Sequence, residues 1–194
     1  MPGPRSIDTR RLPGLVLGGL LAFTGAAVPA RAQTLMTQEE ALGRAFPAPT
    51  RVERRTAYLT EGQLAEASAL AGQDVEMEQT ILTFYVGYRD GRPVGAAYFD
   101  AHRVRTKAEV VMVVVGPEDR IERMDVLKFT EPPEYRAPEG WIEQIEGRPL
   151  DAALSTRGKI VNLTGATLTA RALTSAARRV LALHAVIRPL ERLP

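Results

Sequence analysis

The hydrophobic positions between residues 80 and 130 fall into short runs that are typical of β-strands. Most of these runs are β-branched or aromatic, and one, 110–115, is apolar throughout, as expected for a central strand with both faces buried. Asp90-Gly91 is a hairpin signal, because glycine tolerates a positive φ angle. The predicted strands are residues 81–88, 93–100, 110–115 and 121–129. Their consecutive hairpins predict an antiparallel sheet of about four strands.

Three segments outside these strands repeat with the period of a helix: residues 37–46, 61–71 and 168–187. The first opens with a capping-box pattern, in which Thr37 and Glu40 can bond each other's backbone amides. The last has apolar residues on one face and Arg171, Ser175 and Arg178 on the other. The chain is therefore predicted to have an α+β fold, with helices packed on an antiparallel sheet.

The first 32 residues differ from the rest of the chain. Arginines precede an apolar, glycine-rich run from Leu12 to about Ala30, which ends in Ala30-Arg31-Ala32, a pattern that signal peptidase cleaves. We expect residues 1–32 to be a signal peptide and the mature protein to be periplasmic or otherwise extracytoplasmic. An uncleaved anchor, which would keep the protein at the membrane, is the alternative. The arginine pair at residues 10–11 leaves general and twin-arginine export open.

Removal of residues 1–32 would leave about 160 residues, enough for one domain with a hydrophobic core. We expect residues 33–79 to form an N-terminal helical segment and residues 80–194 to form the functional domain. The chain has 25 basic and 23 acidic residues, and four of the arginines lie in residues 1–32. The remainder is close to neutral, so no basic patch indicates nucleic-acid binding.

Residue types also exclude several chemistries. The chain has no cysteine, which excludes thiol catalysis, iron–sulfur ligation and covalent c-type haem. The two histidines, His102 and His184, are far apart and match no metal-binding spacing, so we expect no metal. His184 lies in an apolar helical segment and is expected to be a packed residue.

A loop of small and hydroxyl residues precedes the long C-terminal helix: Asn162-Leu163-Thr164-Gly165-Ala166-Thr167-Leu168-Thr169. Gly165 would let the backbone approach a ligand, and the free amides and dipole of the helix start favour an anion. Thr164, Thr167 and Thr169 offer hydroxyl groups, and Arg171 follows Thr167 by one turn. The loop is a candidate phosphate site, for which the alternative is an ordinary threonine N-cap. It is not a nucleotide P-loop, because Gly-Lys-Ser/Thr is absent.

Thr164-Gly165-Ala166-Thr167 resembles the Ser/Thr-Gly-Ala-Thr motif of the FMN-binding domain family. That family includes flavinylated subunits of the sodium-pumping NADH:quinone reductase and of the Rnf complex, and a domain of nitrous-oxide reductase regulators. The similarity extends from about Thr80 to His184. It includes the hairpin 88–95, the segment 131–135, Trp141, residues 147–150 and the helix after the motif.

The resemblance implies that FMN is the cofactor and that a flavin transferase joins its phosphate to Thr167. The other residues that it places at the cofactor are Thr164, Gly165, Ala166, Leu168, Thr169, Arg171, Glu131 and Trp141. Trp141 could instead be a core residue, and Glu131 and Tyr135 could be ordinary loop residues. The family often has Asp six residues before the modified threonine, where this chain has Val161. Covalent and noncovalent FMN therefore both stay open.

The resemblance favours an electron-transport protein over a stand-alone enzyme. The flavin would carry the electrons, and a membrane-associated redox protein would exchange them with it. A flavin-free exported binding module of the same fold is the alternative, which Val161 favours. A hydrolase is a third hypothesis, but the chain has no nucleophile-elbow pattern and no histidine near a nucleophile in sequence.

Overall fold

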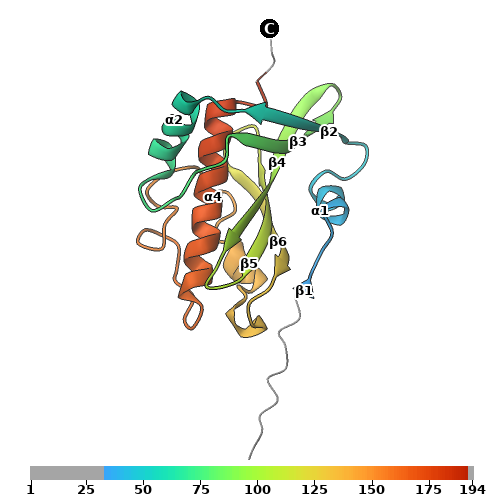
Figure 1. Cartoon of the computed structure of the whole chain (residues 1–194). Helices are drawn as coiled ribbons and strands as arrows, with labels where there is room; N and C mark the ends of the chain where they lie inside the picture. The colour runs from blue at the N-terminus through green and yellow to red at the C-terminus, as the bar shows by residue number, and fades with distance from the viewer. Residues whose placement is uncertain (1–32, 192–194) are drawn as a thin grey trace, which may run out of the picture.

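The structure is a computed structural model that describes residues 33–191. The expected signal peptide, residues 1–32, lies outside the described residues, as do residues 192–194. Six antiparallel strands form one sheet in the order β1-β6-β5-β4-β3-β2 (Figure 1). The strands are β1 (Gln33–Thr34), β2 (Arg51–Tyr58), β3 (Ile81–Arg89), β4 (Arg92–Arg103), β5 (Ala108–Val115) and β6 (Ile121–Phe129).

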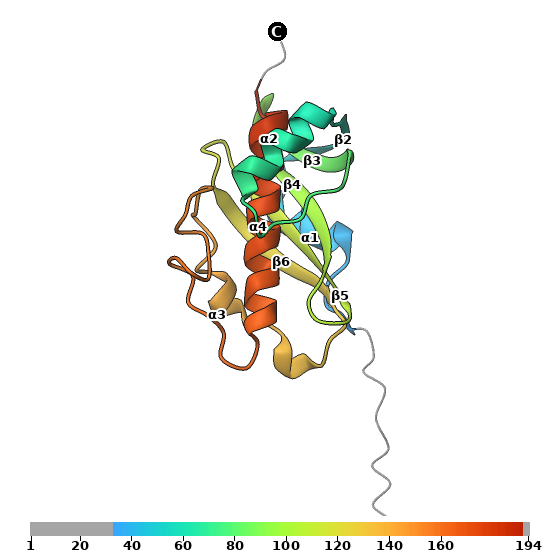
Figure 2. The same cartoon turned by 60° about the vertical axis from the view of Figure 1, so that its left-hand side comes forward.

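Helices cover both faces of this sheet (Figures 1 and 2). The long helix α4 (Thr167–Ile187) and α2 (Glu61–Ala71) pack on one face, and α1 (Gln38–Ala45) packs on the other. The short helices η1 (Pro133–Tyr135) and α3 (Glu139–Ile142) lie in the connection from β6 to α4. The predicted α+β fold, with a C-terminal helix after the threonine-rich loop, is confirmed.

The four predicted strands correspond to β3–β6, and the structure adds β1 and β2. Both additional strands come from residues 33–79, which the sequence indicated only as helical. The sequence of β2 is rich in charge, so its pattern does not indicate a strand. Arg51 and Arg55 instead lie over the ring of Tyr88 on β3, at 5.3 and 5.6 Å from its centroid. Charged side chains are common on edge strands, where they prevent further strand pairing.

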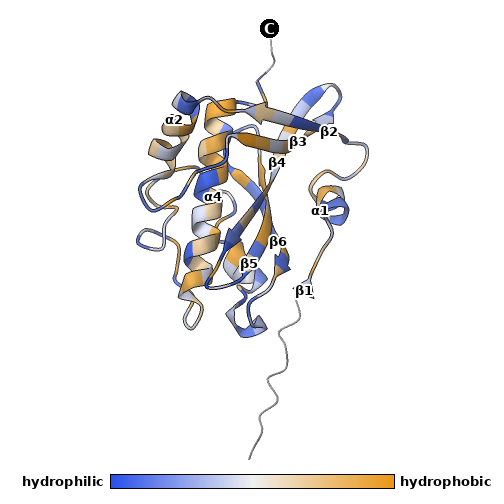
Figure 3. Cartoon of the chain, in the orientation of Figure 1, coloured by the Kyte–Doolittle hydropathy of each residue, from blue (hydrophilic) through white to orange (hydrophobic). Residues whose placement is uncertain are grey.

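The larger hydrophobic core lies between the sheet and α4. Leu173, Ala176, Ala177 and Val180 of α4 are buried with residues such as Val113 of β5. Burial of a large apolar side chain contributes about 1.5–3 kcal/mol, so this face is the main attachment of α4 to the sheet. Figure 3 shows the hydrophobic residues along α4 and β3, with hydrophilic residues in the middle of α4. Within residues 33–191, no helix combines the length and apolarity needed to cross a bilayer.

A smaller core lies on the opposite face, beneath α1. Phe46, which ends α1, packs there with Met112 and Val114 of β5. Its ring takes the space that a side chain at Gly87 would need, since a Cβ there would lie 2.5 Å from a ring carbon. Glycine at this position therefore allows the close approach of α1 to β3.

Candidate functional site

The segment that leads into α4 is held in place by α3 and the turn after it. The indole Nε1 of Trp141 donates a hydrogen bond to the carbonyl oxygen of Val161 at 2.7 Å. The amide of Val161 donates to Oε1 of Gln144 at 2.7 Å, and Nε2 of Gln144 donates to the carbonyl of Trp141 at 2.9 Å. The backbone of Val161 is thus fixed on both sides, while its side chain is 70% exposed.

The first turn of α4 has amides without hydrogen-bond partners. The N-cap residue is Ala166, whose side chain cannot accept a hydrogen bond, so the alternative of a threonine N-cap is wrong. Among residues 33–191, nothing accepts a hydrogen bond from the amides of Thr167, Leu168 and Thr169. No residue of this turn is acidic. Free amides and the positive end of the helix dipole together favour an anion.

Gly165 shapes the turn immediately before this helix. Its φ angle is +83°, a left-handed conformation that glycine adopts without steric cost. The turn is closed by a hydrogen bond from the amide of Ala166 to the carbonyl oxygen of Leu163 at 3.0 Å. A Cβ at Gly165 would meet nothing within 4 Å, so the turn faces open space.

The three threonines of the motif have different surroundings. Thr169 is 1% exposed, and its hydroxyl donates to the carbonyl oxygen of Tyr135 at 2.6 Å. This bond ties α4 to η1. Thr164 is exposed and Thr167 is half-buried, and within the described residues neither hydroxyl has a hydrogen-bond partner. Thr167 is therefore the first-turn residue whose hydroxyl is free for chemistry.

Apolar side chains lie close to this polar turn in sequence. Leu168 follows Thr167 and is 44% exposed, and Val161 precedes the motif. The combination suits a ligand that has both a phosphate and an apolar ring.

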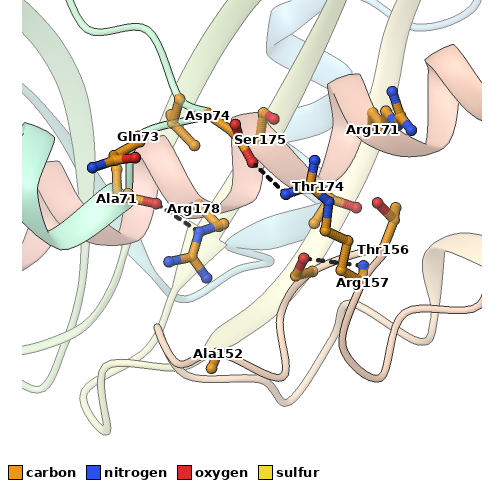
Figure 4. A pocket seen from close by; sticks show the side chains of 13 residues that line it. Ala71, Gln73, Asp74, Ala152, Thr156, Arg157, Arg171, Thr174, Ser175 and Arg178 are labelled. Atoms are coloured by element: carbon orange, nitrogen blue, oxygen red, sulfur yellow. Dashed lines mark hydrogen bonds and ion pairs between the residues drawn. The ribbon is translucent and has the colours of Figure 1, made fainter.

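A groove of about 450 Å³ lies beside α4, toward the end of α2 (Figure 4). Its wall on α4 includes Arg171, Ser175 and Arg178, and the other walls come from residues 71–75 and 152–157. Arg171 is exposed and has no hydrogen bond or ion pair within the described part of the chain. The volume lies in the range of cofactor pockets, about 300–1,000 Å³.

Glu131 and Tyr135 support the turn between β4 and β5. Oε1 of Glu131 accepts hydrogen bonds from the amides of Thr106 at 2.7 Å, Lys107 at 2.8 Å and Arg105 at 3.2 Å. Burial alone would raise the pKa of Glu131, but these amides outweigh it and hold the pKa below its usual value. The guanidinium of Arg105 lies over the ring of Tyr135, 5.0 Å from its centroid. Contact of these residues with a flavin ring stays a prediction.

The ring of Trp141, which the resemblance places at the cofactor, is only 8% exposed and packs in the larger core. The structure thus brings Trp141 near the motif through the backbone of Val161. It does not bring Trp141 and Arg171 to one cavity, since Arg171 lines the groove and Trp141 does not. Stacking of Trp141 on the flavin likewise stays a prediction.

A buried charged cluster fixes the middle of α4 to the sheet. Nη1 of Arg179 lies 2.6 Å from Oδ2 of Asp100. His102 lies between two carboxylates, with Nδ1 2.8 Å from Asp100 and Nε2 3.0 Å from Glu109. Burial opposes the charged imidazole, but the two carboxylates outweigh it and raise the pKa of His102 to about 9. His102 is therefore cationic at neutral pH.

Sequence analysis missed two residues that shape the site. Gln144 aligns the loop through its bond to Val161, but a single glutamine carries no recognisable signal. Arg178 was assigned to the polar face of the helix without a role. Arg178 follows Arg171 by seven residues, which places both side chains on the same side of the helix. This spacing is the feature of the sequence that could have indicated a shared role.

The structure is a helix-on-sheet domain whose long helix starts at a candidate anion site. Residues 107–182 match the family model of the FMN-binding domain, which supports an FMN-binding protein. The match runs from the turn after β4 through the threonine motif to the last turns of α4. FMN is the cofactor that it indicates, and the free amides, hydroxyl and apolar side chains fit this group. No curated protein and no solved structure matches the chain significantly.

Proposed function

We propose that the protein is an exported redox carrier whose FMN is joined by a phosphoester to Thr167 and exchanges electrons with a membrane-associated redox protein. The observation that carries this proposal is the first turn of α4, where three unbonded amides surround a residue with a free hydroxyl. The amides would stabilise the charge of the phosphate, and Oγ1 of Thr167 would supply the bonded atom.

Attachment requires a partner enzyme. The new bond joins Oγ1 of Thr167 to phosphorus, so another group must leave the phosphorus. A flavin dinucleotide provides that group, because breaking its pyrophosphate bond releases AMP, and the hydroxyl proton leaves through a base. No side chain from 160 to 170 titrates near neutral pH. The base would therefore belong to a separate flavin transferase, and the chain would supply the acceptor hydroxyl and the amides that orient the phosphate.

Electron transfer would use the flavin itself, which takes up and releases electrons. The chain's part is to hold the cofactor where a partner can reach it. Thr164, Gly165 and Leu168 are exposed, so the attachment turn lies at the surface. Residues 1–32 support export, which predicts a mature N-terminus at Gln33 when the protein is sequenced from periplasmic and membrane fractions. An intact N-terminus in the membrane fraction would support an anchored protein instead.

The test of the carrier hypothesis is production of the chain with and without an active flavin transferase. We expect a yellow protein whose intact mass rises by one FMN less one water only when the transferase is present. A known substrate of the same transferase serves as the positive control. If the control is modified and this chain binds no FMN in any form, the carrier hypothesis is wrong. A flavin-free binding module, which Val161 in place of Asp favours, then becomes the better hypothesis.

A further inference from the structure

We propose that the groove beside α4 binds a small phosphate ester, at a site separate from the start of α4. The groove is the space of about 450 Å³ between α4, the end of α2 and the loop of residues 152–157 (Figure 4). None of residues 164–169, all of which the structure describes, lines it. Arg178, which does line it, is eleven residues beyond Thr167, about 16 Å along the helix axis at 1.5 Å per residue. A molecule in the groove would therefore be a second ligand, and the proposal does not depend on flavin attachment.

The groove has an excess of positive charge. Among residues 33–191, its lining contains three guanidinium groups and one carboxylate, which belong to Arg157, Arg171, Arg178 and Asp74. An excess of two positive charges favours a ligand with two negative charges. A phosphate monoester carries close to two negative charges at neutral pH, because its second pKa is about 6.

Arg178 is a fixed cation in the wall of this groove. Its Nε donates to the carbonyl oxygen of Ala71 at 2.7 Å, and its Nη1 donates to the carbonyls of Asp151 at 2.6 Å and Leu154 at 3.2 Å. Within residues 33–191, nothing accepts a hydrogen bond from Nη2, which lies 3.6 Å from the place of a Cβ on Gly72, another lining residue. The guanidinium is already immobile, so a hydrogen bond from Nη2 to a ligand would cost little conformational entropy.

Two hydroxyl residues offer further donors to the same groove. Ser175 comes from α4 and Thr156 from the facing loop, and both are half-buried. Within the described part of the chain, neither hydroxyl has a hydrogen-bond partner, and the amide of Thr156 has none. A phosphoryl group has three terminal oxygens to accept from donors on different walls, whereas a carboxylate has two oxygens in one plane. The donor set therefore suits a phosphoryl group better than a carboxylate.

Only a weak ion pair lies across the entrance of the groove. Nη1 of Arg157 lies 3.4 Å from Oδ2 of Asp74, and both side chains are more than 80% exposed (Figure 4). Exposed ion pairs of this kind contribute little to stability. Arg157 can therefore exchange Asp74 for a phosphate oxygen. Asp74 would then repel the ligand, so these two side chains should affect binding in opposite directions.

The test is isothermal titration calorimetry of the full chain, made without a flavin transferase. The probes are glycerol 3-phosphate, inorganic phosphate and succinate at one ionic strength. Ser175→Leu narrows the groove, Arg157→Gln removes a cation, and Asp74→Asn removes the carboxylate. Arg54→Gln is the matched control for loss of an exposed arginine, because Arg54 lies on the face of β2 that points away from α4. Leu168→Glu is the control for anion binding at the start of α4, and thermal melts verify that each variant folds.

We expect glycerol 3-phosphate to bind at one site with a Kd of about 1 mM or below, and succinate to bind about tenfold more weakly. Inorganic phosphate should also bind more weakly, because the rest of the groove has room for the organic part of an ester. Ser175→Leu should weaken binding about tenfold and Arg157→Gln about fivefold, whereas Asp74→Asn should tighten it several-fold. Arg54→Gln and Leu168→Glu should leave the Kd unchanged.

Binding of glycerol 3-phosphate weaker than about 1 mM, or unchanged in Ser175→Leu, would overturn the groove as a site. If Ser175→Leu does not fold, the opposite shifts of the Arg157 and Asp74 variants decide. Equal affinity for succinate or inorganic phosphate would overturn the phosphate ester as the ligand, and loss of binding in Leu168→Glu would assign it to the start of α4. Flavinylated protein should give the same Kd, and a loss there would show that the groove is not a second site. A chain that accepts no flavin would contradict attachment and leave this proposal intact.

Discussion

Helices α2 and α4 begin in opposite ways. At α2, the hydroxyl of Thr60 accepts from the amide of Gln63 at 3.2 Å, and Oε1 of Gln63 accepts from the amide of Thr60 at 3.0 Å. At α4, the N-cap is Ala166 and the first amides stay unbonded within the described residues. The polar groups at the start of α2 serve folding. Those at the start of α4 have no partner within the described residues, although Thr164 and Thr167 lie on either side of Ala166.

This difference has a modest energetic cost. A missing side-chain cap destabilises a helix by about 1 kcal/mol. The 21-residue α4 buries many apolar side chains, each contributing about 1.5–3 kcal/mol when large, so the fold tolerates the open start. The 11-residue α2 has fewer buried residues and gains proportionally more from its cap.

The largest expected effect is on flavin attachment, and it should differ between variants at the start of α4 and variants at the start of α2. We expect Thr167→Val to abolish the covalent FMN adduct with little change in stability, because its hydroxyl has no structural partner in the described chain. Thr60→Val should keep the adduct but lower the free energy of unfolding by about 1 kcal/mol. Flavin fluorescence on denaturing gels measures attachment, and urea unfolding measures stability.

Two further threonines serve as controls for position. Thr169→Val should largely keep the adduct, since its hydroxyl already bonds Tyr135, and Thr164→Val should give an intermediate yield. Valine keeps the β-branch of threonine, so a cavity should not contribute. An adduct that peptide mapping finds on the Thr167→Val protein would contradict the assignment.

The second prediction concerns what holds α4 in the absence of a cap. His102 has a folded-state pKa of about 9, above its value of 6.5 in an unfolded chain. Its ion pairs therefore stabilise the fold fully below pH 6.5, and the contribution disappears as the pH rises through 9. We expect the wild type to lose on the order of 2 kcal/mol between these values. Urea unfolding of His102→Gln should show a much smaller loss, and an equal loss would argue against the cluster as the cause.

The third prediction adds charge to the open start of α4. Leu168→Glu places a carboxylate in the first turn, where it should stabilise the helix by about 0.3–1 kcal/mol. The same carboxylate should repel an incoming phosphate and slow flavin attachment several-fold. Leu168→Gln has nearly the same shape without charge and should slow attachment less. Equal rates of flavin attachment for the two variants would show that a charge at position 168 does not affect binding of the phosphate at the free amides.

The smallest expected effect on stability is at Val161. Its side chain is exposed and its backbone is held by Trp141 and Gln144, so Val161→Asp should change stability by less than about 0.5 kcal/mol. If the transferase uses a carboxylate at this position, the variant should be flavinylated faster than the wild type. Val161→Asn is the matched neutral control. A rate increase shared by the Asn variant would exclude charge as the reason.

The sequence predicted those parts of the fold that follow from a local pattern. The apolar run of β5, the hairpin at Asp90-Gly91 and the buried stripe of α4 all correspond to structure, because burial and turn geometry constrain these residues directly. The strand β2 was missed because Arg51 and Arg55 are stabilised by Tyr88 of a neighbouring strand. The sequence of β2 alone does not reveal this contact with a residue of another strand.

The candidate site was predictable in location but not in detail. The motif and the start of the helix indicated the candidate turn at residues 164–169, which lies within the range that matches the family model. The unbonded amides were not predictable, because a threonine-rich loop indicates a capped helix as readily as an open one. The groove also needed the structure, since the carbonyls that fix Arg178 come from Ala71, Asp151 and Leu154. Such contacts depend on packing between segments that are distant in sequence.

The position of β1 bears on how the protein would meet the redox partner that we propose. β1 pairs Gln33 with Phe129, and both views place it at the same end of the molecule as the first turn of α4 (Figures 1 and 2). A tether that enters at Gln33 would hold the flavin end close to the bilayer and raise the effective concentration of a membrane partner. Cleavage at the same point would instead release a shuttle whose electron delivery depends on collision frequency. Cleavage of the single peptide bond before Gln33 would thereby determine whether the protein acts while tethered to the membrane or while diffusing freely.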